Sequence, residues 1–447
     1  MSGRKYKRQT TRRWAGLGWV VAGITWLAFG HIGADSAYPQ IASYERPPID
    51  YLNAEVHDPV ARLHQKLVSG EVKLEYDPKH GFLPAILQAL DVPVSSQTLV
   101  FSKTSLQLQK ISPRLPRALY FNDEVYVGFC QRGDVLEFGA TDDWQGATFY
   151  TLEQSSQEAP RFVRDQGSCL TCHASARTQN VPGYLIRSVY PNGAGHPILG
   201  SGTFTTDHTS PFKERWGGWY VTGKHGEMRH LGNQVFVKDG TKEAELESGA
   251  NADSLDKWIK PDSYLTPHSD LVALMVLEHQ TQMHNALAAA NYETRQALHQ
   301  SFEMNKLLER PTDMISDSAQ RRIDAVVEQV VRQLLFCDEF RLENPVSGTS
   351  EFANEFAARG PFDGQGRSLR QFDLQTRMFR FPCSYLIYSG SFRKLPTEAR
   401  TAVVAQLTKI LNSSDPQPGF LHLSSADKTA VLEILRETHP DFQQPAS

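Results

Sequence analysis

One apolar segment near the N-terminus limits what the rest of the chain can fold into. Residues 14–34 contain no Asp, Glu, Lys or Arg, and they follow six basic residues, Arg4, Lys5, Lys7, Arg8, Arg12 and Arg13. The segment is 21 residues long, and a bilayer core needs about 20. Basic residues keep their side of such a segment in the cytoplasm. We therefore expect residues 1–37 to be a basic tip and transmembrane anchor, with the rest on the periplasmic or extracytoplasmic side.

A cleaved signal segment is the alternative for the same residues. Such signals have an apolar region of about 7–15 residues and a cleavage site of small residues, which Ala34 and Ser36 would supply. The pair Arg12-Arg13 is also compatible with twin-arginine export. The length favours the anchor, which would make the membrane a partner of the chain through residues 14–34.

Charge and cysteine content exclude several classes of protein. The net charge is −4 over 447 residues, and the part after the basic tip is acidic. An acidic body lacks the basic face that nucleic-acid binding needs, so we expect no nucleic-acid partner. Five cysteines are too few for a disulfide scaffold. A chain of this length has room for two to four domains at roughly 100–200 residues each.

Cys169-Leu-Thr-Cys172-His173 is the motif that carries chemistry. A Cys-x-x-Cys-His run is the attachment signature of c-type haem. The two thiols add to the haem vinyl groups, and the imidazole becomes the proximal iron ligand. For a chain with 5 Cys and 15 His, the expected number of chance matches is about 0.002. We therefore expect one covalent haem c, bound by Cys169, Cys172 and His173.

Two other sites use a similar cysteine pair. A zinc site would need further ligands, and the sequence has neither a second Cys-x-x-Cys nor a close histidine pair to supply them. A thioredoxin-like dithiol follows a buried strand, whereas Cys169 follows a polar turn at residues 164–168.

Hydrophobic periodicity predicts an α+β chain, with an antiparallel β-rich domain that bears the haem followed by a helical domain. We expect a tether and entry at residues 38–96, the β-rich domain at 97–240, a linker at 241–265 and the helical domain at 266–447. Short β-branched and aromatic runs predict strands at 99–101, 117–121, 125–129, 135–138, 148–152, 184–190, 219–221 and 234–237. Helical spacing predicts helices at 269–290, 293–308, 318–336, 397–411 and 425–437, the last with a capping signal at Ser424 and Asp427.

The motif and several other segments resemble known proteins. Cys169 to His173 is similar to the c-type cytochromes. The wider chain resembles a family of bacterial membrane-anchored monohaem proteins with a cytochrome c domain, through RTQNVPG at 177–183, GTFTTDH at 202–208, RWGGWYVTG at 215–223, LMVLEHQ at 274–280 and FPCSYLIY at 381–388. The resemblance implies haem binding and electron transfer, but no substrate. Only Cys169, Cys172 and His173 take roles from it.

The sixth iron position decides what such a haem does. A Met or His ligand there is typical of an electron carrier, and an open position allows ligand binding or peroxide chemistry. Our first candidate is His279, because Met275, His279 and Met283 follow one apolar helix face. Met275, Met283, His225 and His230 are the other candidates. A core histidine held by a buried hydrogen bond is the alternative for His279.

Each of three further groups of residues has two possible interpretations. Arg215, between glycines and aromatics at 215–220, could pair with a haem propionate or belong to a bulged strand with core aromatics. Cys130, Cys337 and Cys383 read as buried thiols, with a Cys337–Cys383 disulfide as the alternative. The cluster Glu278, Gln282, His284 and Asn285 reads as a wet helix face rather than a second metal site.

The sequence thus favours a membrane-associated c-type haem protein that transfers electrons to an unidentified redox partner protein. The alternative is a haem-dependent oxidoreductase of peroxidase type, or a ligand sensor, with an open sixth iron position. A scaffold with a structural haem is a third class. The sequence leaves open whether the protein is an enzyme.

Overall fold

The computed structural model describes residues 43–157, 159–237 and 246–443. These described residues belong to one compact unit. The expected anchor at residues 14–34 lies outside the described residues. Within the described ranges, no helix is long and apolar enough to cross a membrane.

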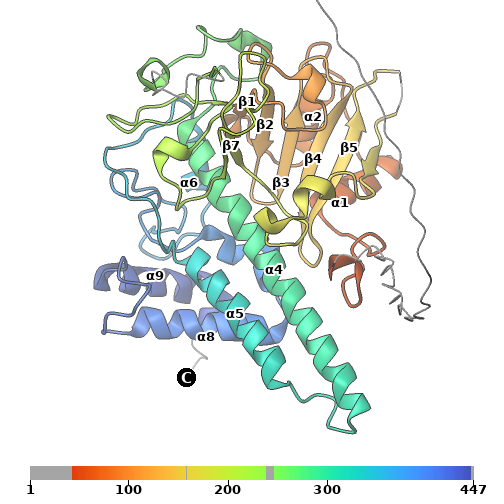
Figure 1. Cartoon of the computed structure of the whole chain (residues 1–447), viewed down its shortest axis with the longest axis vertical. Helices are drawn as coiled ribbons and strands as arrows, with labels where there is room; N and C mark the ends of the chain where they lie inside the picture. The colour runs from red at the N-terminus through yellow and green to blue at the C-terminus, as the bar shows by residue number, and fades with distance from the viewer. Residues whose placement is uncertain (1–42, 158, 238–245, 444–447) are drawn as a thin grey trace, which may run out of the picture. The chain divides into compact units, whose positions relative to one another are not determined.

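A seven-stranded antiparallel sheet is the centre of the β-rich part (Figure 1). Its strand order is β6-β5-β4-β3-β2-β1-β9. The strands are β1 (Thr98–Val100), β2 (Arg117–Phe121), β3 (Val125–Phe129), β4 (Val135–Asp142), β5 (Gly146–Glu153), β6 (Phe162–Arg164) and β9 (Trp219–Tyr220). A separate pair, β7 (Arg187–Val189) and β8 (Thr203–Thr205), forms a small two-stranded sheet.

Helices cover both faces of the large sheet. On one face, α1 (Pro59–Val68) and α2 (Leu83–Ala89) contribute Leu63 and Ile86 to a core shared with Val127 and Leu152 of the sheet. On the other face, Tyr126 and Phe149 join the core of the long helix α4 (Leu271–Leu307). This alternation follows from the strand period of two, which turns successive side chains to opposite faces.

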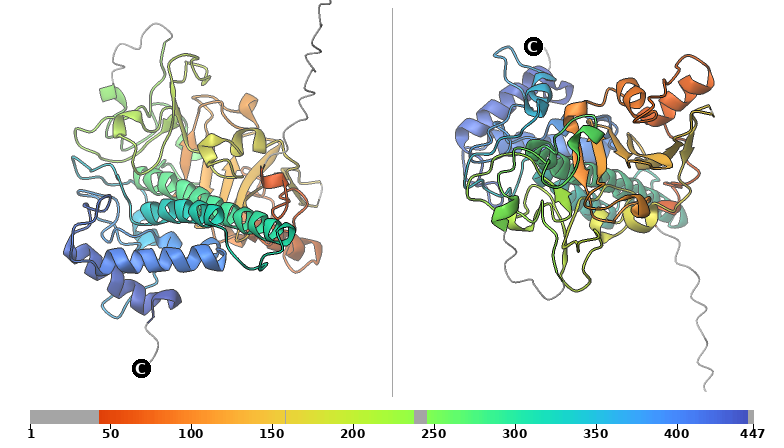
Figure 2. Two further views of the ribbon diagram at one scale, coloured as in Figure 1. Left: turned by 60° about the horizontal axis from the view of Figure 1, so that its bottom comes forward. Right: turned by 90° about the horizontal axis from the view of Figure 1, so that it is seen from above.

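The helix α4 is the central support of the described fold. Figure 2 shows α4 and α5 (Asp317–Leu334) between the sheet and the pair α8 (Thr397–Asn412) and α9 (Ser425–Thr438). Asp270 caps α4, because its Oδ1 accepts hydrogen bonds from Val272 N at 2.8 Å and Ala273 N at 3.0 Å. The remaining helices are short: α3 (Leu170–His173), α6 (Phe352–Ala358) and α7 (Gly390–Arg393).

The α+β fold expected from the sequence is confirmed, with differences in particular elements. The strands predicted at 117–121 and 125–129 form with those bounds. The helices predicted at 269–290 and 293–308 are one continuous helix, because neither Gly nor Pro separates them. No strand forms at 234–237. The β-rich and helical parts share one core within a compact unit, so their division into two domains remains a prediction.

The expected tether also differs, because α1 and α2 lie within residues 38–96. The start of α1 has a local helix signal. Pro59 is its first residue, and Asp58 caps the helix by accepting hydrogen bonds from Val60 N and Ala61 N. Val60 is fully buried, so this stretch is part of the folded unit rather than a spacer.

Candidate functional site

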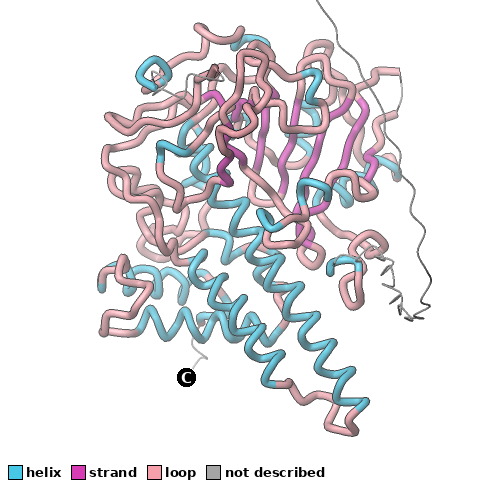
Figure 3. Tube along the Cα trace, in the orientation of Figure 1, coloured by secondary structure: helices cyan, strands magenta, loops and turns pink. Residues whose placement is uncertain are grey.

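The Cys-x-x-Cys-His motif follows the edge strand β6, in a part of the chain that Figure 3 shows as mostly loop. Asp165 joins the motif to the sheet, because its amide donates to Phe149 O at 2.9 Å. The Asp165 carboxylate then accepts from Gly167 N at 2.9 Å and Cys169 N at 3.0 Å. These bonds fix where the helical turn of the motif begins.

The motif itself is a single helical turn. Cys169 O accepts hydrogen bonds from Cys172 N at 3.1 Å and from His173 N at 3.0 Å. The turn therefore places both cysteines and the histidine on one short segment, α3 with its preceding residue. Cys172 is exposed and Cys169 is half-buried, and both thiols are free. Free, accessible thiols are what thioether formation requires.

Gly183 holds His173 at two points. The Gly183 amide donates to His173 O at 2.8 Å, and its carbonyl oxygen lies 2.9 Å from His173 Nδ1. A carbonyl only accepts hydrogen bonds, so Nδ1 carries the proton and Nε2 carries the lone pair. Among the described residues, no hydrogen bond involves His173 Nε2. Metal-binding histidines are typically fixed in this way, with the second nitrogen left to the metal.

Burial and an aromatic neighbour favour the neutral form of His173. Its ring lies 4.7 Å from the Phe149 ring, centroid to centroid. Burial is the main cause that lowers the pKa of His173, although the hydrogen bond to Gly183 opposes it. A neutral imidazole is the form that binds a metal.

Asn285 of α4 holds the segment that carries Gly183. Its Oδ1 accepts from Tyr184 N at 2.8 Å, and its Nδ2 donates to Tyr184 O at 2.8 Å. A side chain at position 183 would not fit, because a Cβ there would lie 2.3 Å from Asn285 Oδ1. The central helix thus supports His173 through Asn285 and Gly183.

The thiol chemistry argues against a redox dithiol. Burial first, and then the charge of Asp165, raises the pKa of Cys169 to about 12. A nucleophilic cysteine in a Cys-x-x-Cys redox motif needs a lowered pKa instead.

One arginine, Arg187, interacts electrostatically with the exposed cysteine. Arg187 is half-buried and donates to Thr203 Oγ1 at 3.3 Å. Burial lowers the pKa of Arg187, and its charge interacts with Arg177 and with Cys172. Arg177 is exposed. Arg187 is therefore a cation whose charge acts on the exposed thiol of Cys172.

No family model, no curated protein and no solved structure matches this chain. In the part of the chain that the structure describes, no three His, Cys, Asp or Glu side chains are grouped to hold a metal ion. A zinc site takes three or four protein ligands, whereas the attachment motif supplies a haem iron with one. A proposal for the function therefore rests on the geometry of the motif.

His279 has protein partners at both ring nitrogens. Its Nε2 lies 2.8 Å from Ser384 Oγ, and its Nδ1 lies 3.2 Å from His208 Nδ1. His208 Nε2 faces the Cys337 carbonyl at 3.3 Å, so His208 Nδ1 accepts, His279 Nδ1 donates and Ser384 donates to His279 Nε2. The buried hydrogen bond that we gave as the alternative for His279 is confirmed. The role of His279 as sixth iron ligand, our first candidate from the sequence, is untested and would require these bonds to break, so the bonds favour the alternative.

The other sixth-ligand candidates lie in the core. His225 Nδ1 faces Met228 O at 2.6 Å, and its Nε2 accepts from Asn251 N at 2.9 Å. His230 is buried and accepts from Gly232 N at 3.0 Å. Met275 and Met283 are buried among the apolar residues of α4.

Arg215 forms a buried ion pair with Glu278. Its guanidinium is thus already paired with a carboxylate of the protein, unlike an arginine that is free to pair with a haem propionate. The two groups lie 3.0 Å apart, and their side chains are 2% and 0% exposed. Burial raises the pKa of Glu278 to about 7 and outweighs the attraction of Arg215. The aromatics beside Arg215 are core residues, as the second reading expected.

The wet helix face expected for the Glu278 cluster is wrong. Gln282, His284 and Asn285 are buried like Glu278. The physical reason is that α4 packs between the sheet and other helices, where Glu278, His284 and Asn285 have polar partners inside the fold. Cys130, Cys337 and Cys383 are buried free thiols, which confirms the first reading of these residues.

Sequence reasoning missed the residues that support the motif: Asp165, Gly183 and Asn285. Two of them leave a local signal. Asp165 precedes Gly167 in a turn sequence, and Pro182-Gly183 is a turn dipeptide. The contact of Asn285 with Tyr184 spans 101 residues, and no local pattern predicts it.

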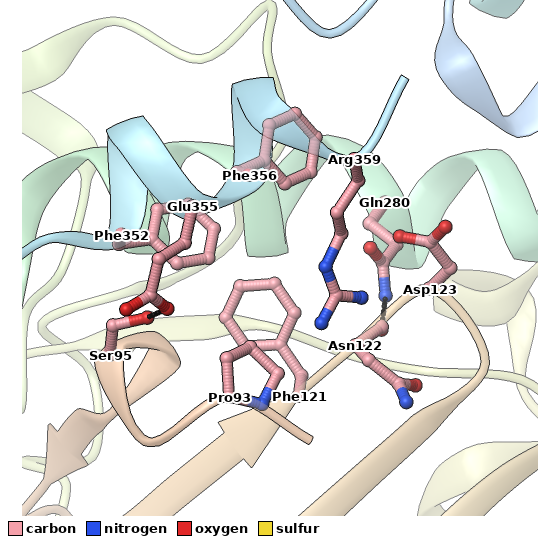
Figure 4. Close-up of a pocket in the computed structure, with 10 residues that line it drawn as sticks. All are labelled: Pro93, Ser95, Phe121, Asn122, Asp123, Gln280, Phe352, Glu355, Phe356 and Arg359. Carbon is pink, nitrogen blue, oxygen red and sulfur yellow. Dashed lines mark hydrogen bonds between the residues drawn. The ribbon is translucent and has the colours of Figure 1, made fainter. Parts of the chain in front are cut away.

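A small cavity lies apart from the motif, between the β2–β3 turn and α6 (Figure 4). Its volume of ≈ 10 Å³ suffices for about one water molecule. Phe121, Phe352 and Phe356 form its apolar walls, and Gln280 donates to Asn122 O beside it at 2.7 Å. None of the motif residues line this cavity.

Proposed function

We propose that this protein is a c-type haem protein with one haem, covalently attached at Cys169 and Cys172 and ligated by His173. The observation that carries the proposal is the double hydrogen bond between His173 and Gly183, at 2.8 Å and 2.9 Å. It fixes the imidazole with Nε2 free, on the same helical turn as two free thiols.

The residues around the motif fit the group. The thiols of Cys169 and Cys172 would form the thioether bonds, and Phe149 would pack beside the proximal ring. When bound, haem supplies a one-electron iron couple whose potential depends on the axial ligands and on burial.

Electron transfer is the activity that this arrangement supports best. Because Cys172 is exposed, the attached edge of the group would lie at the protein surface. An exposed edge favours electron exchange with a redox partner protein. We further propose that the chain acts on the extracytoplasmic side, held at the membrane through residues 14–34.

A second candidate function follows from the histidines. Both ring nitrogens of His279 and of His225 have partners within the protein. If none of the candidate side chains fills the sixth position, the iron is open to ligands. That favours a peroxidase-like oxidoreductase or a ligand sensor. A low-spin spectrum supports the carrier, and a high-spin spectrum that changes with CO or cyanide supports the second candidate.

Covalent attachment is the test of the proposal. The full chain is produced in a host that attaches c-type haem and is run on a denaturing gel stained for haem. We expect a stained band for the wild type and for a Cys337→Ala control, since Cys337 lies elsewhere in the core. The Cys169→Ala/Cys172→Ala double variant should give no stain. Equal staining of that variant would refute the attachment site.

A further inference from the structure

A wide, positively charged groove lies away from the motif. Its volume is ≈ 690 Å³, within the range of roughly 300–1,000 Å³ that small ligands occupy. It runs between the second half of α4, the β4–β5 turn and the start of α8. The charged side chains that line it are Arg295, Arg393, Lys394, Arg400 and Glu398.

The cations of this groove are short of carboxylate partners. Among the described residues, no carboxylate lies within 4 Å of Arg295, Arg393 or Lys394, and Arg400 Nε is 3.9 Å from Asp441 Oδ2. Asp143 and Glu124 do not line the groove, but the charges of both interact with Arg393. Four cations and one acid, Glu398, line the groove, and Arg393 and Lys394 are exposed. The side chains that line the groove therefore carry a net positive charge.

An aromatic and a cation are fixed together at one end of the groove. The Arg295 guanidinium lies 4.4 Å from the centroid of the Trp144 ring. Arg295 also donates to Pro48 O at 2.8 Å and to Trp144 O at 3.2 Å. Trp144 stays 43% exposed. A tryptophan with one wet face beside a cation is typical of protein surfaces that meet membrane headgroups.

The groove lies where the chain enters the fold. Pro48 lines it and is 14 residues after Ala34, the last residue of the expected anchor. An extended chain spans at most about 3.5 Å per residue, so the groove is within about 50 Å of a membrane that holds the anchor. The connection is thus short enough for the groove to reach the membrane surface.

We propose that this groove binds the headgroup of an anionic membrane phospholipid. The phosphate would pair with Arg393 and Lys394, and Trp144 would lie at the level of the headgroups. The proposal goes beyond electron transfer and does not depend on the haem, but it rests on the proposed anchor at residues 14–34. It assigns the face around Trp144 and Arg393 to the membrane.

A titration with short-chain lipids tests the proposal on the full chain in an uncharged detergent. The probes are dihexanoylphosphatidylglycerol, dihexanoylphosphatidylcholine and inorganic phosphate, and the signal is the tryptophan fluorescence that a Trp144→Phe variant lacks. We expect the glycerol lipid to bind at least tenfold more tightly than the choline lipid and than phosphate. High salt should weaken its binding, because salt screens exposed charges.

A charge-reversal variant supplies the matched comparison. Arg393→Glu/Lys394→Glu should weaken binding of the glycerol lipid at least tenfold, and Lys213→Glu, an exposed lysine outside the groove, should not change it. Equal affinity for the two lipids would overturn the proposal, because charge would then not matter. Phosphate binding as tight as lipid binding would also overturn it, in favour of a site for soluble anions.

Discussion

At the scale of single residues, one carbonyl decides which nitrogen of His173 is free. Gly183 O accepts from Nδ1 at 2.9 Å, so the lone pair is on Nε2. Gly183 is suited to this position because any Cβ would meet Asn285 Oδ1 at 2.3 Å. The contact between a histidine and a backbone oxygen ten residues later thus prepares the ligand before any iron is present.

Replacing His279 should destabilise the fold without changing the iron. His279→Ala leaves Ser384 Oγ and His208 Nδ1 without their partner, and buried polar groups without a partner cost free energy of unfolding. We expect a loss of about 2–4 kcal/mol by urea unfolding, with an unchanged spin state in the absorption spectrum. His299→Ala, at a half-buried position of the same helix, is the control and should cost less. A change from low spin to high spin in His279→Ala would instead assign His279 to the iron.

His284 should make the fold sensitive to acid. Burial lowers the pKa of His284 to about 4, and an unfolded histidine has a pKa of about 6.5. The unfolded state therefore binds more protons below pH 6.5, so the stability that is present above that pH is lost as the pH falls towards 4. From pH 7 to 5 the loss from this group is about 2 kcal/mol.

Chemical unfolding at pH 7 and pH 5 measures this effect. The His284→Gln variant should lose less unfolding free energy between the two pH values than the wild type, by about 2 kcal/mol. Glu278, whose pKa burial raises to about 7, acts in the opposite direction but is common to both proteins. An identical pH dependence in both would show that His284 does not titrate in this range.

At the scale of elements, α4 connects the motif to the rest of the fold. Asp270 fixes its start: besides capping the helix, its Oδ2 accepts from Thr349 N and Ser350 N, both at 2.8 Å. Four turns later Asn285 fixes the segment that holds His173. The long helix therefore supports the His173 segment through Asn285, and it contributes none of the three residues assigned to the haem.

Loss of Asn285 should disturb the iron while leaving the haem attached. Asn285→Ala removes both bonds to Tyr184, so Gly183 and the His173 imidazole lose their support. We expect a shifted reduction potential and a broadened EPR signal, with haem staining retained. Asn291→Ala is the control, because Asn291 is buried on the same helix but bonds Arg295 rather than the motif segment. Identical potentials for wild type and Asn285→Ala would contradict the supporting role.

The elements that could be predicted are those whose signals are local. Ser424 and Asp427 form the expected capping box of α9, and β2 and β3 have the period and turn that the sequence indicates. The strands β6 and β8 are not predicted, because neither contains a run of three consecutive apolar residues such as the one at 99–101 that indicates the equally short β1. The prediction that the Glu278 cluster of α4 faces solvent is wrong. The partners of Glu278 and Asn285 lie in distant segments, which no local pattern shows.

At the scale of the whole molecule, the chain combines one attachment motif with a large folded unit. The described residues belong to that unit, and the motif lies at the edge of its sheet. The ligands Cys169, Cys172 and His173 could be proposed from five consecutive residues. Their supports could be predicted only in part: Gly183 belongs to a turn dipeptide with Pro182, whereas Phe149 and Asn285 come from distant parts of the fold.

Cell fractionation should find the protein in the membrane. We expect the full chain to remain there after a high-salt wash. An apolar segment of 21 residues spans the bilayer and does not need electrostatic attraction to stay there. An alkaline wash gives the same result for an inserted segment. A mature protein free in the periplasm, with its N-terminus near Tyr38, would show that the segment is a cleaved signal.

The pyridine haemochrome spectrum of the purified full chain is the sharpest test of covalent haem attachment at Cys169 and Cys172. We expect the spectrum of haem with two thioether bonds, at one haem per chain, and no release of haem by acid–acetone extraction. A chain without haem, produced in a host that attaches haem to other c-type proteins, would refute the attachment. So would a haem that acid–acetone extracts.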